Sequence, residues 1–472
     1  MAIIRAALIL ALIASLTGCV QPRQIRNDYS RGATLQSAEV LPPPEEVPPS
    51  CDTGTETANE NRRVIEDYGE YSLAFAEFDD QGWSYDADRQ LTFIRERLAQ
   101  ELKDPTYRDW DFVVVVFTHG WHHNAHSNDC NVQEARQMLL LASKRFDDAV
   151  RQGKFHRHRR VFGIYVGWRG ESVDAAVLRY ATVIDRQDAA EKVAKGSVRQ
   201  LFADLHQQQL IARAAAATDP HRQTPDHEPI PTDIAARMYT IVVGHSFGGL
   251  IVFNALSQQL INDLTAAADE ACTPGGVTGA SQTWPDSVVL INPAFEASRL
   301  EPLNRLADRA AACHYSPAQP LLTVITADND HWTGQVFTAG RRVQTLFDKY
   351  DDSSPGSRAT ERDANVHAIG FVNRYRTHRL CLWPPDGERH ATVSVDLTAV
   401  STADPSTVSH RAVWVVGAPK EIVDGHDGFL YARTRGQVPQ PYLLDWLVAT
   451  HADPTAAISA PGTCGPWHWP TP

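Results

Sequence analysis

Short apolar segments and helical patterns alternate along most of the chain. Segments that are apolar throughout or regularly alternating, and so predict strands, lie at residues 71–78, 112–117, 161–166, 239–243, 287–291, 321–325 and 413–416. Apolar residues recur every three or four positions, as in a helix, at residues 88–102, 132–150 and 250–261. Strands with two apolar sides that alternate with helices predict the α/β class, with a mostly parallel central sheet flanked by helices.

The segment from about residue 170 to 235 is too long for a simple connection between neighbouring strands. Its many Ala, Gln and Arg residues predict a helical insertion between the fourth and fifth core strands, which we expect to cover part of the working edge of the sheet. The sequence therefore predicts one main domain over residues 61–455, followed by a C-terminal tail over residues 456–472.

The first residues have the pattern of an export signal. Arg5 precedes an apolar run at residues 6–16, which is too short to span a membrane but fits the core of a signal peptide over residues 1–18. The run ends in Leu-Thr-Gly-Cys, with the cysteine at position 19, which resembles the lipobox of bacterial lipoproteins. The resemblance implies that Cys19 is lipidated and becomes the mature N-terminus; an ordinary secretory signal that happens to contain a cysteine is the alternative.

The residues after Cys19 predict where the protein is held. Val20 stands where an Asp would favour retention at the inner membrane, so we expect an anchor in the outer membrane of the cell envelope, facing the periplasm. Residues 19–60 are rich in Pro and Glu and predict a semi-rigid tether.

Composition excludes two classes of function. The net charge of −13 argues against a nucleic-acid partner, which would need a basic patch. No apolar run reaches the roughly 18 residues of a spanning helix, so a multi-span transporter is excluded. A hydrophobic fraction of 43% lets the chain bury a sizeable core, and its acidity means that membrane contact should come from the lipid anchor.

Six cysteines remain besides Cys19, and export permits disulfides. We expect one bond across the predicted strand at residues 287–291 and one that ties back the C-terminal tail. The expected pairings are Cys272–Cys313, Cys381–Cys464 and, by elimination, Cys51–Cys130.

The strongest chemical signal is Gly-His-Ser-Phe-Gly-Gly at residues 244–249, between the predicted strand 239–243 and a helical pattern. A nucleophilic Ser246 at a sharp strand-to-helix turn needs small residues two positions to either side, and Gly244 and Gly248 supply them. The turn exposes the serine Oγ above the sheet, with the start of a helix beneath the developing oxyanion. A glycine-rich turn with a bystander serine is the alternative.

A second signal, Thr-His-Gly-Trp at residues 118–121, directly follows another predicted strand. With the motif at 244–249, Asn-Pro-Ala-Phe at 292–295 and Asp-Gly-His at 424–426, it resembles the α/β-hydrolase superfamily, in a poorly characterised esterase-like branch. The likeness runs from about residue 71 to 446. It implies an α/β-hydrolase fold and a Ser-His-acid triad, and it leaves the substrate open.

In this fold two backbone N–H groups hold the oxyanion, one from the loop after the third strand and one from the residue after the nucleophile. The resemblance implies Trp121 and Phe247 for these roles, which leaves their side chains free to line the pocket. Arg169 follows the fourth strand and could hold a substrate carboxylate or phosphate, but we favour a role in bracing a loop. The residues expected to line the pocket are Trp168, Arg169, Phe295 and His331.

The general base is expected after the acid in sequence, in the loop that follows the last strand. His426 lies there, after the strand at 413–416, and Gly425 and Gly428 let the loop turn toward Ser246. The competing histidines are His367, His378, His410 and His451. His378 lies in a basic stretch and is interpreted as a surface or packing residue.

The acid should follow the predicted strand at 321–325, where Asp328 and Asp330 compete. In an extended loop these side chains point to opposite sides, so only one can face His426. Related sequences carry an acid-x-Asp-x-x-Thr-Gly pattern that aligns with Asp330, and Asp328 would then be exposed or cap the next turn. Glu296 is a more remote candidate.

Four histidines, at positions 119, 122, 123 and 126, raise the alternative of a metal site. A metal needs three or four ligands that converge in space, but His119 belongs to the oxyanion loop, and the adjacent His122 and His123 diverge. We therefore expect no metal here.

We expect a serine hydrolase that cleaves carboxylic esters through an acyl-enzyme, without a cofactor. A lipase or phospholipase acting on membrane lipid is the first alternative, which a large exposed apolar rim would favour. A non-catalytic binding protein on the same scaffold is the second, which a broken triad would favour. The expected partners are a small-molecule or lipid ester and the membrane, and the oligomeric state stays open.

Overall fold

The computed structural model describes residues 23–30, 39–44, 53–155, 157–170, 179–219, 237–273, 283–315, 317, 319–354, 356–383, 394–399, 411–430 and 441–452. The predicted signal peptide, Cys19 and the predicted C-terminal tail lie outside these residues. Among the helices that are described, none is long and apolar enough to cross a membrane.

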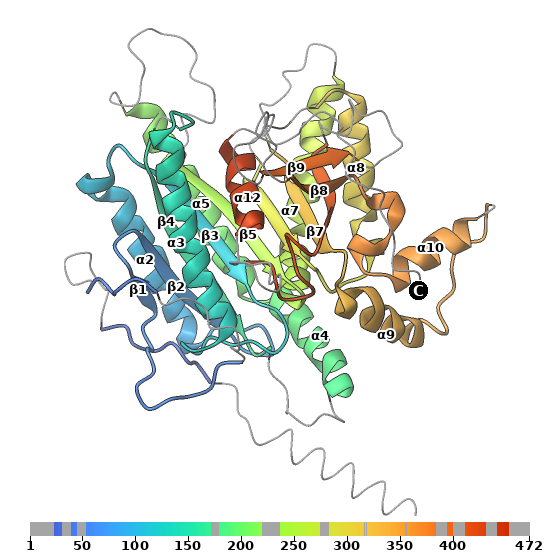
Figure 1. Ribbon diagram of the computed structural model, residues 1–472, viewed down its shortest axis with the longest axis horizontal. Helices are drawn as coiled ribbons and strands as arrows, with labels where there is room; N and C mark the ends of the chain where they lie inside the picture. Colours follow the sequence, from blue (N-terminus) through green and yellow to red (C-terminus); the bar gives the residue numbers. More distant parts are fainter. Residues whose placement is uncertain are drawn as a thin grey trace, which may run out of the picture.

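A sheet forms the centre of the molecule (Figure 1). Within the described residues it has ten strands in the order β1-β2-β4-β3-β5-β6-β7-β10-β8-β9. Every pairing from β2 to β8 in this order is parallel, and β1 and β9 add antiparallel strands at the two edges. The strands are β1 (Ile65–Asp67), β2 (Tyr71–Phe78), β3 (Asp111–Thr118), β4 (Arg159–Trp168), β5 (Met238–His245), β6 (Ser287–Ile291), β7 (Leu322–Ala327), β8 (His378–Trp383), β9 (Ser394–Ala399) and β10 (Val413–Ala418).

Two apolar cores lie on the two faces of the sheet. Successive side chains of a strand point to opposite faces, so β3, buried along its whole length, contributes to both cores. The helices α3 (Cys130–Arg151) and α12 (Tyr442–Ala452) cover one face. The helices over the other face are α2 (Arg89–Lys103), α5 (Val198–Thr218), α7 (Phe247–Cys272) and α8 (Glu301–Ala312).

The predicted insertion between the fourth and fifth core strands contains two helices in its described part, α4 (Arg179–Lys195) and α5. Of these two helices, only α4 agrees with the expectation that the insertion covers part of the working edge. α5 instead packs on the face of the sheet, against β5, α2 and α7. α4 packs against α7, and its Arg186 donates to the main-chain oxygen of Arg169 (2.9 Å), just after β4, so α4 does reach the carboxyl edge.

Part of the predicted tether packs on the domain. Arg26 is fully buried and pairs with Glu66 of β1 at 2.9 Å, and its backbone N–H donates to Glu77 at 2.7 Å. Gly54 likewise donates its N–H to Asp129, at 2.9 Å. The tether predicted over residues 19–60 is therefore too long. Arg26 and Gly54 are held on the domain by carboxylates that lie far along the chain from them.

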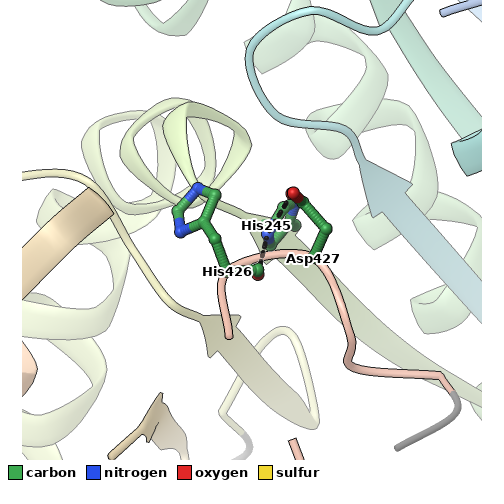
Figure 2. Close-up of side chains that lie close together, drawn as sticks. All are labelled: His245, His426 and Asp427. Atoms are coloured by element: carbon green, nitrogen blue, oxygen red, sulfur yellow. Dashed lines mark hydrogen bonds and ion pairs between the residues drawn. The ribbon is translucent and has the colours of Figure 1, made fainter. Parts of the chain in front are cut away.

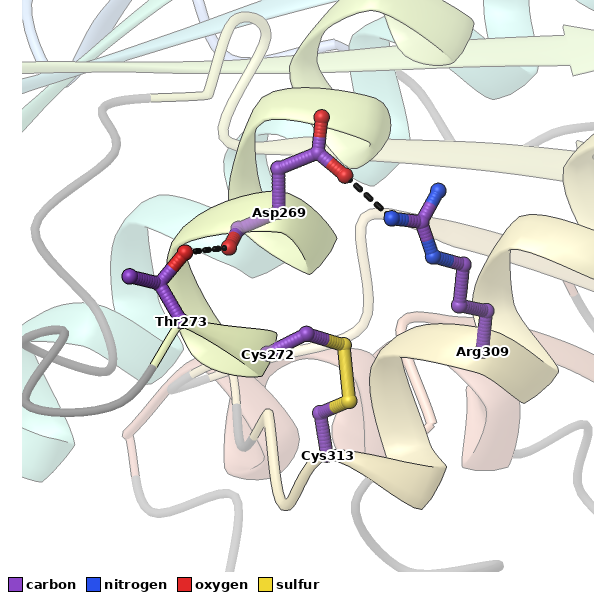
Figure 3. Close-up of a disulfide and its surroundings, with 5 residues drawn as sticks. All are labelled: Asp269, Cys272, Thr273, Arg309 and Cys313. Carbon is purple, nitrogen blue, oxygen red and sulfur yellow. Dashed lines mark hydrogen bonds and ion pairs between the residues drawn. A yellow bond between two sulfur atoms is a disulfide. The ribbon is translucent and has the colours of Figure 1, made fainter.

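One predicted disulfide is confirmed. Cys272, at the end of α7, is bonded to Cys313, just after α8, and so joins two helices that pack side by side (Figure 3). The same ends carry an ion pair between Asp269 and Arg309. Cys130 and Cys381 are also disulfide-bonded, and their predicted partners, Cys51 and Cys464, lie outside the described residues.

The predicted fold class is confirmed. A mostly parallel sheet is flanked by helices on both faces, with inserted helices between β4 and β5, as in an α/β-hydrolase. In open parallel sheets, ligands bind beyond the carboxyl ends of the strands. The loops after β3, β5, β7 and β10 all lie at this edge, and they carry the residues of the candidate site.

Candidate active site

Ser246 occupies the turn between β5 and α7. Its backbone has φ 54° and ψ −121°, a combination that a residue with a side chain rarely adopts and that costs about 1–3 kcal/mol. Hydrogen bonds hold this conformation: the Ser246 N–H donates to Ile291 at 3.0 Å, and its carbonyl accepts from Ala294 at 3.1 Å. The sharp turn places the serine at the carboxyl edge of the sheet, at the N-terminal end of α7.

The glycines around Ser246 allow backbone segments to touch. A Cβ on Gly244 would lie 2.7 Å from the carbonyl oxygen of Gly248, and a Cβ on Gly248 would lie 2.1 Å from that of Thr118. A Cβ on Gly120 would lie 2.8 Å from the Cβ of Ser246. Larger residues at these positions would push the loop after β3 away from the serine, so the two motifs form one compact site.

His426 reaches Ser246 from the loop after β10. Its Nε2 lies 2.8 Å from the Ser246 Oγ, and its Nδ1 lies 2.9 Å from the Oδ2 of Asp330. The loop is a tight turn in which Gly425 has φ 69° and a Cβ on Gly428 would lie 2.4 Å from the Asp424 carbonyl oxygen. These two glycines therefore allow the histidine to face the serine.

Asp330 follows the end of β7 and is 3% exposed. Besides His426, it accepts hydrogen bonds from the N–H of Trp332 at 2.9 Å, the N–H of Thr333 at 3.2 Å and the Thr333 hydroxyl. Burial acts to raise the pKa of Asp330, but His426 and the Thr333 donors outweigh it and lower the pKa below its ordinary value. The carboxylate is thus ionised and accepts the Nδ1–H of His426, which leaves Nε2 to accept the serine proton.

The same pairing acts on the histidine. Burial acts to lower the pKa of His426, whose side chain is 13% exposed, but the carboxylate of Asp330 raises that pKa to about 9. The Asp330 carboxylate therefore stabilises the protonated imidazole that forms when His426 takes a proton.

The other candidate acids have different partners. Asp328 forms an ion pair with Arg379 at 3.1 Å, and burial, partly opposed by Arg379, raises its pKa to about 6. Glu296 forms an ion pair with Arg299 at 2.8 Å. The structure thus brings Asp330 to His426 and places Asp328 beside a different residue.

The competing histidines that the structure describes have other partners. His378 is a packing residue and not a surface residue: it is 1% exposed and its ring lies 4.6 Å from that of Trp414. His367 pairs with Asp363 at 2.9 Å. His410 and the side chain of His451 lie outside the described residues.

Three residues that the sequence did not single out hold the loop of His426 in place. The ring Nε2–H of His245 donates to the main-chain oxygen of His426 at 2.9 Å (Figure 2). Asn292, just after β6, donates to that same oxygen at 2.8 Å and accepts from the Ala327 N–H at 2.8 Å. Asn329 lies between the two aspartates and accepts from the Gly425 N–H at 2.9 Å. The only signals in the sequence were the positions of His245, Asn292 and Asn329 beside site residues.

Replacement of Asn292 by alanine is expected to lower kcat for an ester roughly 10- to 100-fold with little change in KM, because the loop of His426 loses its fixed position. Asn292→Asp should be as damaging, since a carboxylate cannot donate to the two carbonyls that Asn292 now holds. Steady-state kinetics on both variants, with Asn262→Ala on α7 as the control, tests this. Normal kcat in Asn292→Asp would contradict the positioning role.

Two backbone N–H groups beside Ser246 are available to a ligand. Phe247 is the first residue of α7, where helical N–H groups lack intrahelical acceptors. Within the described residues, neither its N–H nor that of Trp121 donates to another protein group. The ring of Trp121 packs edge-on against that of Trp332, with 5.7 Å between centroids, and so joins the loop after β3 to the segment after β7.

His119 fixes the shape of the Trp121 loop. Its Nδ1–H donates to the Gly120 oxygen at 2.9 Å, and its Nε2 accepts from the Trp168 N–H at 3.1 Å. Burial lowers the pKa of His119 to about 4, so the ring stays neutral. Trp168 returns the contact by donating its indole N–H to the His119 oxygen at 2.9 Å.

The residues expected to line the pocket lie in different surroundings. Trp168 is 3% exposed and Phe295 is fully buried, stacked on Phe253, so both lie in the core and not at the surface of the site. Arg169 forms an ion pair with Asp80 at 2.5 Å, which agrees with the favoured role in bracing a loop. His331 is exposed to solvent.

Two groups of side chains contain residue types that can bind a metal. His245, His426 and Asp427 each offer a ligand atom within 4.8 Å of the others (Figure 2). Both nitrogens of His426 are occupied by Ser246 and Asp330, and the Nε2–H of His245 is donated to a carbonyl. This group therefore serves the geometry of the site and is not arranged to bind a metal.

The histidines of the loop after β3 have separate partners. His123 pairs with Asp129 at 3.0 Å, and His126 pairs with Glu60 at 2.6 Å. Because His119 also uses both ring nitrogens, these side chains do not converge on a common point.

Comparison with known proteins gives few matches. No protein-family model and no curated protein matches the sequence. Similar solved structures include phospholipase PlaB from Legionella pneumophila, at 15% identity over 61% of this chain and 51% of that chain, with a TM-score of 0.21. The same phospholipase in complex with thio-NAD matches at 14% identity over 61% and 49%, with a TM-score of 0.19. The chain thus spans about half the length of these structures, and similarity at this level does not identify a function.

Proposed function

We propose that the protein is a serine hydrolase that cleaves carboxylic esters, with Ser246, His426 and Asp330 as its catalytic triad. One observation carries this proposal: an unbroken series of hydrogen bonds runs from the Ser246 Oγ through the His426 ring to Asp330, with links of 2.8 and 2.9 Å. The serine sits at a strand-to-helix turn, the position that a nucleophile occupies in this fold. A non-catalytic binding protein would need none of this arrangement.

The reaction divides into two similar halves. His426 takes the proton of Ser246 as Oγ bonds to the acyl carbon, and then gives this proton to the departing alcohol oxygen. The acyl group stays on the serine as an ester. Water next attacks that ester, with His426 again taking the proton and returning it to Oγ, and the acid product leaves. Asp330 stabilises the imidazolium in both halves, and no cofactor takes part.

The developing oxyanion would be held by the backbone N–H groups of Trp121 and Phe247. Each such donor contributes about 3 kcal/mol to the stability of the transition state. The close contacts of Gly120 with Ser246 and of Gly248 with Thr118, which hold the two loops together, support this assignment.

The mature chain is expected to hydrolyse p-nitrophenyl esters with a rapid first turnover, because the phenol leaves when the acyl-enzyme forms. Stopped-flow absorbance should show one phenol released per site before the steady state. A panel from short to long acyl chains then gives the preference for chain length. Absence of turnover across the whole panel would contradict the proposed function.

The pH dependence of kcat/KM is expected to follow His426, which must be neutral to act as a base. Asp330 raises the pKa of His426 to about 9, so the neutral fraction, and with it kcat/KM, should rise with pH up to about that value. In Asp330→Asn, the histidine loses this carboxylate while burial still lowers its pKa, so the midpoint should fall below that of the parent. A pH profile of both proteins with a soluble ester tests this; equal midpoints would contradict it.

We further propose that the chain is exported and lipid-anchored through Cys19 in the bacterial outer membrane, facing the periplasm. The signal-like residues 1–18 and the lipobox-like sequence that follows support this assignment. A membrane-lipid ester is the second candidate substrate, because several large apolar side chains, Val343, Leu346 and Phe347 among them, are exposed.

A further inference from the structure

A run of exposed apolar side chains lies on and just after α9 (Phe337–Gln344). Val343 is 75% exposed, Leu346 is 71% exposed and Phe347 is 90% exposed. A single exposed apolar residue is common on a protein surface, but three large ones within five positions mark a surface made for a contact.

These side chains continue a line that starts at the site. From Trp332 the apolar positions Val336 and Val343 follow at helical spacing, and Gly340 between them faces open space. Leu346 and Phe347 lie in the turn just after α9. We call Trp332, Val336, Val343, Leu346 and Phe347 the apolar stripe. Its first residue packs against Trp121, with 5.7 Å between the ring centroids, and Trp121 follows Gly120, which lies against Ser246.

The opposite side of α9 is fastened to the protein. Thr338 is buried, and Arg341 donates to the main-chain oxygen of Asn365 at 3.2 Å. Arg341 also lies 3.9 Å from Glu296, which follows β6, so α9 lies close to the carboxyl edge of the sheet. These contacts fix the position of α9, with its exposed apolar side chains on the side that faces solvent.

The chain from the predicted anchor arrives at this same edge. The N–H groups of Ile25 and Arg26 donate to Glu77, near the carboxyl end of β2, at 2.9 and 2.7 Å. Three residues lie between Cys19 and Arg23, where the described chain begins, and the four steps from Cys19 to Arg23 span about 14 Å at most. A lipid on Cys19 would therefore hold the carboxyl edge, with Ser246 and α9, close to the bilayer.

We propose that the apolar stripe inserts into the surface of a lipid bilayer, so that the site takes its ester substrates from the membrane. This inference rests on the proposed function and names its substrate class as membrane-lipid esters. The charges around the stripe, from Arg342 and Lys349 against Asp348 and Asp351, nearly balance, and the whole chain has a net charge of −13. Insertion of apolar groups drives the contact, so a zwitterionic bilayer is sufficient.

A fluorescent label on residue 347 tests the contact directly. The mature chain with Phe347→Cys carries an environment-sensitive dye at that thiol and is incubated with phosphatidylcholine vesicles. The dye should shift to shorter wavelength and be quenched by nitroxide groups on the lipid chains. The control is the same dye at Leu210→Cys, on α5, where the native side chain is 42% exposed; it should stay in water. Equal signals at the two positions overturn the proposal.

Turnover separates docking from catalysis. Leu346→Glu/Phe347→Glu should lower hydrolysis of a long-chain ester in vesicles roughly tenfold or more, and leave hydrolysis of a soluble short-chain ester unchanged. The matched control, Leu210→Glu/Ile211→Glu, should change neither. Equal loss on both substrates, or none on vesicles, overturns the proposal. A concentration-dependent dimer that the Glu pair dissolves, with no lipid quenching, makes the stripe a self-association surface and also overturns it. The quenching result stands even if no ester is turned over, so failure of docking and failure of the proposed function are distinguishable.

Discussion

Ser246→Ala is expected to lower kcat for ester hydrolysis by roughly six orders of magnitude, as loss of the nucleophile does in a comparable triad. The change removes one oxygen atom and keeps the Cβ, so the strained turn and its hydrogen bonds to Ile291 and Ala294 remain. His426 then has no proton to take at 2.8 Å. The thermal unfolding midpoint should stay close to that of the parent.

The matched control for this variant is Ser257→Ala, which lies further along the same helix. It should retain full kcat. Turnover by Ser246→Ala within tenfold of the parent would mean that the nucleophile is another group. A large fall in the unfolding midpoint would mean that the loss of activity reflects a damaged fold.

Asp330→Asn is expected to lower kcat by up to about ten-thousand-fold, because an amide in place of the carboxylate favours the wrong tautomer of His426 and no longer stabilises the imidazolium. Asp330 is 3% exposed and receives the His426 Nδ1–H at 2.9 Å, so its carboxylate is the one hydrogen-bonded to the imidazole. The measurement is kcat on a soluble ester at a pH where the parent is fully active.

Asp328→Asn is the control two residues away. It loses an ion pair with Arg379 that takes no part in the proton path, so kcat should change by less than about threefold. If instead Asp328→Asn has a strongly reduced kcat and Asp330→Asn has a kcat near that of the parent, the acid has been assigned to the wrong carboxylate.

The strands of the central sheet could be predicted because each is an apolar run buried on both faces. Strand β8 escaped prediction because it begins in a polar stretch, where Arg379 pairs with Asp328 and His378 packs on Trp414. The edge strands β1 and β9 are short or polar and have no comparable pattern. Burial of Arg26 could not be predicted either, because its partner Glu66 lies forty positions away in the sequence.

The placement of the candidate site followed from local signals and chain order. A serine between glycines after a strand, and a histidine between glycines after the last strand, each have a physical reason that the sequence displays. The residues that hold His426 in place have no such signal in the sequence. His245 comes from the end of β5, and Asn292 and Asn329 come from the loops after β6 and β7, so only the folded sheet brings their side chains to one turn.

The most direct test of the central claim is to identify the residue that a fluorophosphonate modifies. We expect a single covalent adduct on the Ser246 Oγ in the mature chain, found by mass spectrometry of the peptide that holds residues 244–249. We also expect no adduct in Ser246→Ala and markedly slower labelling in Asp330→Asn than in Asp328→Asn. An adduct on any other residue, or undiminished labelling of Ser246→Ala, would contradict the assignment of this site.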